Sequence, residues 1–172
     1  MRSFLALVLT FLFAVNATAQ QTSNRVVAAG ASDLQAFRIL LNRDILLMQM
    51  SDEAEAAGHP NPFLRQQLAI RFGLNEDDNA SLHRLATAYK REMEPLRAEV
   101  SVVMNQFRSR FPGGIVRRGD DLSPPPRLAE LQREEDALTL RYRDLLHNSM
   151  REATFQALQS EVHLEFGGGS AQ

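Results

Sequence analysis

The sequence contains no cysteine, and Lys90 is the single lysine among its 172 residues. Without cysteine, the small extracellular scaffolds that depend on disulfides are excluded, as are thiol catalysis and thiol redox exchange. The formal net charge is only -2, which does not indicate a strong electrostatic partner such as nucleic acid. The folded chain must therefore be stabilised by the packing of apolar side chains.

Long hydrophobic runs are also scarce. The longest, Phe4–Val15, is interrupted by Thr10 and is shorter than the roughly 20 apolar residues that a membrane span needs. It follows Arg2 and precedes the small residues Ala17-Thr18-Ala19, an order typical of a secretory signal peptide. We expect residues 1–19 to be a signal peptide cleaved after Ala19, with a retained anchor as the alternative. The protein is then periplasmic or secreted, and the absence of cysteine favours a bacterial periplasm.

Behind the signal peptide, the composition indicates one domain. Residues 20–31 are polar and small, which predicts a flexible leader, and residues 167–172 predict a disordered tail. Ser32-Asp33-Leu34-Gln35 has the pattern of a capping box and predicts the start of a helix over about 33–57. Gly58-His59-Pro60 predicts its end. We expect a single helical domain over 32–166 and no membrane span after cleavage.

This first helix is apolar on two sides. One predicted face holds Leu34, Phe37, Leu41, Ile45 and Met48, and the opposite face holds Ile39, Leu40, Leu46, Leu47 and Met50. A helix that is apolar nearly all round lies between neighbours or at an interface. The surplus face predicts a protein-binding surface formed by Ile39, Leu46 and Met50.

Two helices follow. Pro62 to Phe72 predicts a short helix stopped by Gly73, and Asn75 predicts the N-cap of a long helix over about 76–111. Its apolar residues recur every three or four positions over about 30 residues: Leu82, Leu85, Tyr89, Met93, Leu96, Val100, Val103, Phe107 and Phe111. The stripe keeps its phase across Pro95, which predicts a bend in the helix and not its end.

A second long amphipathic segment covers about 125–166, starting at the prolines 124–126. Its apolar stripe changes phase after Met150, and Ser149 to Glu152 has a capping-box pattern. We expect a kink or a new helix near 148–153; one straight helix with two neighbours is the alternative. No segment alternates as a strand would. The prediction is an all-α fold of four to five helices, with 76–111 and 125–166 forming an antiparallel hairpin or bundle with the N-terminal helix.

Motifs for chemistry are missing as well. There is no nucleophile motif of the G-x-S-x-G type and no phosphate-binding glycine loop. Helical metal sites need ligands three or four residues apart, whereas His147 and His163 are sixteen apart, and the acids near His83 suit a helix start. We therefore expect no catalytic residues, no cofactor and no metal site.

The segment Phe72-Gly73-Leu74-Asn75-Glu76-Asp77-Asp78, followed by a long amphipathic helix, resembles the L-G-L-T-x-x-Q helix start of the Spy/CpxP-type periplasmic stress proteins. Asn75 stands where that motif has threonine and Asp78 where it has glutamine, and no second copy of the motif is present. The resemblance implies a curved, antiparallel helical dimer. It also implies a role in holding unfolded clients without ATP, or in damping an envelope stress sensor.

Three hypotheses follow. The leading one is a non-enzymatic exported protein that binds other polypeptides, as an ATP-independent periplasmic chaperone or as an envelope-stress adaptor, with homodimerisation possible. The second is a structural or assembly subunit of an envelope complex, working as a helical dimer. The third is a periplasmic metal-resistance sensor, which would need His147 or His163 to bind metal.

Overall fold

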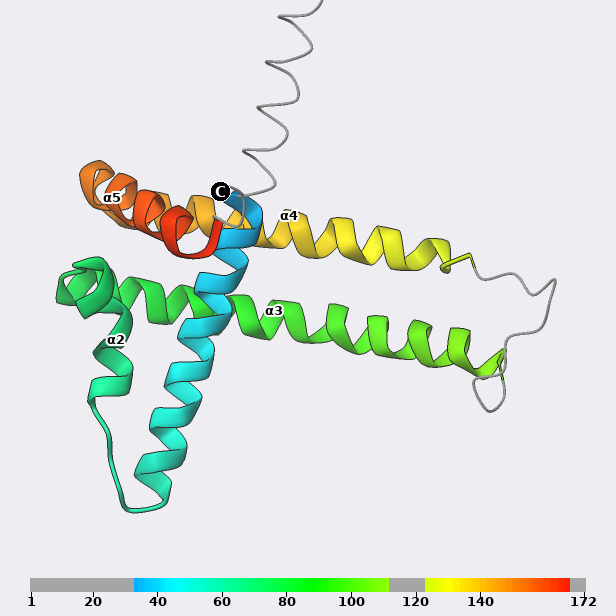
Figure 1. The fold of residues 1–172 in the computed structure, drawn as a ribbon, viewed down its shortest axis with the longest axis horizontal. Coiled ribbons are helices and arrows are strands. Elements are labelled where there is room, and N and C mark those ends of the chain that lie inside the picture. The colour runs from blue at the N-terminus through cyan, green and yellow to red at the C-terminus, as the bar shows by residue number, and fades with distance from the viewer. Residues whose placement is uncertain (1–32, 112–122, 168–172) are drawn as a thin grey trace, which may run out of the picture.

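A computed structural model describes residues 33–111 and 123–167, and all regular secondary structure in these two ranges is helical (Figure 1). The predicted all-α fold is confirmed. The predicted signal peptide at 1–19, the leader at 20–31 and Ser32 of the predicted capping box lie outside the described residues. Of the predicted tail, only Gly167 is described, and it closes the last helical turn.

The first two helices form a short hairpin. The N-terminal helix covers residues 33–56, one residue short of its predicted end, and a turn containing Gly58 leads to α2, Phe63–Phe72. Gly73 ends α2 in the left-handed conformation with φ 64°, which glycine adopts without steric cost. Asn75 then begins α3, and its Oδ1 accepts a hydrogen bond of 2.8 Å from the Asp78 amide. Both predicted boundaries are confirmed.

Two long helices form the predicted antiparallel hairpin (Figure 1). Helix α3 spans Glu76–Ser109 and α4 spans Pro126–Ser149. Pro95 lies inside α3 without ending it, and its side chain is exposed. Pro126 occupies the first turn of α4, where its missing N–H costs nothing.

The predicted break in the last segment is confirmed, but not its predicted cap. Met150 and Arg151 are extended, and α5 begins at Glu152 and ends at Val162, followed by a π-helical turn over His163–Gly167. The Ser149 hydroxyl donates to the Leu146 carbonyl within α4, and the N-cap of α5 is Arg151, which makes no side-chain cap hydrogen bond. Ser149 is the last residue of α4, so it is too early in the chain to be the N-cap of α5.

The core lies towards one end of the hairpin (Figure 1). There the N-terminal helix crosses both α3 and α4, and α5 folds back along α4. Phe37 of the N-terminal helix stacks on Phe155 of α5 at 5.8 Å, and Tyr89 meets Tyr142 edge-on across the hairpin. The prediction for the faces of the N-terminal helix was partly wrong. Leu40 and Leu47, assigned to the surplus face, are buried in the core, because the buried face is wider than one stripe.

The other end of the hairpin is a two-helix arm. No residue of α3 beyond Met93 is buried, although the apolar stripe continues to Phe111. On α4, Leu131 is the buried residue nearest the tip. The apolar stripe of α3 predicted from the sequence is therefore buried as far as Met93 and only partly covered beyond it.

Candidate functional site

The residues predicted as a protein-binding face lie on one outward stripe of the N-terminal helix. Leu46 and Met50 are 55% and 44% exposed, and Ile39 is half-buried. The three positions are 7 and 11 residues apart, which is close to two and three helical turns, so they share a face. The structure brings all three together on the side of the helix away from the core.

Both apolar and polar contacts fix this orientation. Phe37 and Leu41 are fully buried on the opposite side of the helix. Arg38 pairs with Asp136 of α4, and Asn42 accepts a hydrogen bond of 2.9 Å from Arg97 of α3. These contacts turn the stripe outward, and they leave Leu46 and Met50 largely exposed.

Helix α2 adds two exposed apolar residues that the sequence analysis did not single out. Phe63 and Ile70 are 56% and 61% exposed. They are seven residues apart and so lie on one face of α2. That spacing was the available signal, but in a helix of only ten residues a single pair is weak evidence.

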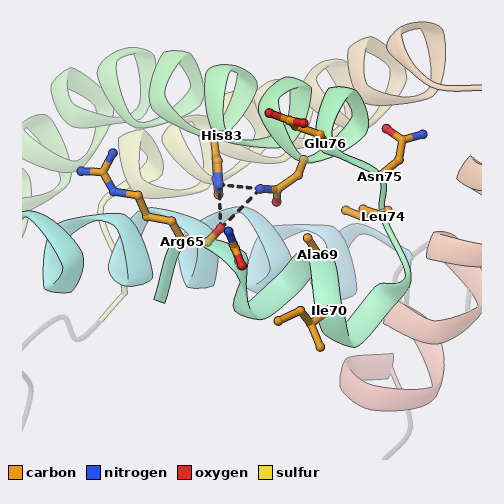
Figure 2. A pocket seen from close by; sticks show the side chains of 9 residues that line it. Arg65, Ala69, Ile70, Leu74, Asn75, Glu76 and His83 are labelled. Carbon is orange, nitrogen blue, oxygen red and sulfur yellow. Dashed lines mark hydrogen bonds between the residues drawn. The ribbon is translucent and has the colours of Figure 1, made fainter. Parts of the chain in front are cut away.

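An open groove lies between α2 and the start of α3 (Figure 2). Ala69, Ile70 and Leu74 form its apolar part, while Arg65 and His83 are among its polar residues. The lining chemistry suits the binding of a mixed polar and apolar group.

His83 joins three helices at the wall of this groove. Its Nδ1 lies 2.8 and 3.0 Å from the carboxylate oxygens of Asp44, a fully buried residue of the N-terminal helix. Its Nε2 lies 2.9 Å from the Arg65 carbonyl of α2 and 3.1 Å from Asn79 Nδ2 (Figure 2). The hydrogen bond to Asp44 raises the pKa of His83, against the opposing effect of burial.

A second imidazole–carboxylate pair anchors the first described turn of the N-terminal helix. The Asp33 Oδ1 lies 2.8 Å from His163 Nε2 and accepts a hydrogen bond of 3.1 Å from Gln159, while Oδ2 accepts from Arg143 of α4. Burial acts to raise the pKa of Asp33, but His163 and Arg143 outweigh it, so the pKa lies below its usual range. This stabilising contribution is present above the ordinary value of 3.8 and is lost as pH falls through the lowered pKa.

Sequence reasoning missed both pairs. The partners are 39 and 130 residues apart in the chain, so no local spacing marks them. His147, the other histidine considered for metal binding, lies 2.6 Å from Glu152 Oε2. Within residues 33–111 and 123–167, no three His, Asp or Glu side chains converge as a metal site would require.

Comparisons with known proteins give the chain no relatives: no family model matches it, and no curated protein or solved structure matches it significantly. No helix among the described residues combines the length and the apolar composition needed to cross a bilayer.

Proposed function

We propose that this is a non-enzymatic, exported bacterial protein that binds other polypeptides in the periplasm, as an ATP-independent chaperone or an envelope-stress adaptor. One observation carries the proposal: the N-terminal helix presents Leu46 and Met50, with Ile39, on a stripe that the described fold does not cover. Apolar side chains gathered on one exposed face indicate a site for another protein.

Met50 on this stripe suits apolar partners of different shapes. It is 44% exposed, whereas Met48 lies on the opposite face of the helix and packs against the core. Methionine is unbranched and polarizable, so it adapts to apolar surfaces of different shapes.

The test is suppression of aggregation of a reduced, unfolded client by the purified exported protein. We expect suppression by the wild type and a clear loss in the double variant Leu46→Ser/Met50→Ser. Val102→Ser is the matched control, because Val102 is 53% exposed but lies on α3, outside the proposed face. No suppression by the wild type at several-fold excess would reject the chaperone function, and equal loss in the control would reject this face.

Export has its own test. Mass spectrometry of the protein recovered from the periplasm should give a chain that begins at Gln20, after cleavage at Ala19. A chain retained in the membrane fraction with Met1 intact would contradict the proposed location.

The half-exposed arm supports the second candidate, a structural subunit that works as a helical dimer. Val100, Val103 and Phe107 of α3 are covered only in part and could form a permanent interface. Sedimentation separates the two functions, since an obligate dimer that ignores unfolded clients favours the structural one.

A further inference from the structure

Two buried carboxylates mark the face by which the N-terminal helix is attached. Asp33 is 7% exposed and Asp44 is fully buried. They are eleven residues apart, about three helical turns, and therefore lie on the same face. Each meets an imidazole from a different part of the fold, His163 after α5 and His83 in α3.

The two carboxylates differ in which other side chains donate hydrogen bonds to them. Asp33 also accepts a hydrogen bond from Arg143 of α4, and a guanidinium stays charged at every accessible pH. Among the described residues, the side chain that hydrogen-bonds to the Asp44 carboxylate is His83. The Asp33 end is thus held wherever the Asp33 carboxylate is ionised, whereas the Asp44 end depends on one imidazole.

Each ring nitrogen of His83 lies within hydrogen-bond distance of an acceptor oxygen. When the ring is protonated, Nδ1–H donates to Asp44 and Nε2–H donates to the Arg65 carbonyl of α2. A neutral ring has one N–H, so it can serve only one of these acceptors. If Nδ1 keeps the proton, the bare Nε2 faces a carbonyl oxygen at 2.9 Å, with only the Asn79 amide able to donate to it.

We propose that His83 is a pH-sensitive latch that holds the N-terminal helix and α2 against α3 when protonated and loosens them when neutral, while Asp33 remains the fixed end. The charged groups around the latch are Asp44 on the N-terminal helix and the Arg65 guanidinium on α2, which is itself paired with Asp52 and Glu55. Glu76 of α3 lines the same groove.

The direction follows from the His83 pKa, which is raised above the ordinary value of 6.5. The latch is fully closed below about 6.5 and opens as pH rises through the raised value. Loosening at the Asp44 end would uncover Ile45 and Leu47, which are buried when the helix is attached. The latch does not depend on the proposed function, because it concerns only contacts within this chain.

Hydrogen exchange of the full chain tests the latch. Between about pH 5.5 and about pH 8.5, after correction for intrinsic rates, protection over 44–56 and α2 should fall about threefold to tenfold relative to 138–146, the effect of one net hydrogen bond. His83→Gln should remove this pH dependence and give low relative protection throughout. His59→Gln, in the turn before α2, is the matched control and should behave as wild type.

A second measurement keeps the test decisive if His83→Gln folds poorly. In wild-type protein, the imidazole of His83 and the amides of 44–47 should titrate with one common midpoint by NMR. The latch is rejected if wild-type relative protection does not change with pH, if the change persists in folded His83→Gln, or if the amides do not follow the His83 titration.

Discussion

Tyr89 and Thr139 form a buried pair of hydroxyls where α3 meets α4. Thr139 donates a hydrogen bond of 2.9 Å to the Glu135 carbonyl, so its oxygen is the acceptor for the Tyr89 hydroxyl at 3.2 Å. Both side chains are fully buried. The pair thus adds a buried polar contact between α3 and α4, next to the partly buried hydrogen bond from the Tyr142 hydroxyl to Glu92.

Removing the Thr139 hydroxyl should lower the free energy of unfolding more than removing the Tyr89 hydroxyl. In Thr139→Val the Tyr89 hydroxyl stays buried without an acceptor, which should lower the free energy of unfolding by about 1–3 kcal/mol. Tyr89→Phe removes the donor and leaves Thr139 bonded to Glu135, so its cost should be about 1 kcal/mol. Urea unfolding of both single variants and the double variant measures this. Fully additive costs, or a Thr139→Val protein as stable as wild type, would contradict the assignment.

At the scale of an element, the junction between α2 and α3 is built from local signals. Gly73 supplies the left-handed residue that ends one helix, and Asn75 supplies the side-chain acceptor that begins the next. Such signals depend only on neighbouring residues, which is why the sequence predicted both boundaries. The same holds for the break after Ser149, which the change in apolar phase predicted.

Other features depend on contacts that chain spacing does not encode. Periodicity shows that a helix has an apolar face but not which helix covers it or how wide the covered face is, so Leu40 and Leu47 were assigned to the wrong side. Pairing across elements is harder still to predict. Asp44 reads as one polar residue in an apolar helix, and only the crossing of that helix over α3 brings it to His83.

The cap of α3 offers a matched test. Asn75→Ala removes the acceptor for the Asp78 amide and should cost about 1 kcal/mol in the free energy of unfolding. Asn105→Ala makes the same exchange at an exposed position inside α3 and should stay within about 0.5 kcal/mol of wild type. Thermal melts followed by circular dichroism compare the two. Equal effects would show that the Asn75 side chain does not act as a cap.

At the scale of the whole molecule, the hairpin has two unequal ends. The N-terminal helix, α2 and α5 all gather at the end that contains the core, and the arm consists of α3 and α4 alone (Figure 1). Arg127 of α4 links the two helices of the arm through Glu99 of α3, and it also pairs with Glu130 and Glu134 on its own helix, with all four side chains well exposed. Exposed ion pairs of this kind add little stability, so the burial of apolar side chains determines which parts of the hairpin are most stable.

This division predicts a gradient of stability along α3 and α4. Amides of α3 beyond Leu96 and of α4 before Leu131 should exchange through local opening, many times faster than those near Tyr89 and Tyr142, which should require global unfolding. Exchange measured by mass spectrometry at low protein concentration gives the comparison. Equal protection along the whole hairpin would contradict it. Protection of the arm that increases with protein concentration would instead mean that a second copy covers Val100, Val103 and Phe107, as the structural function requires.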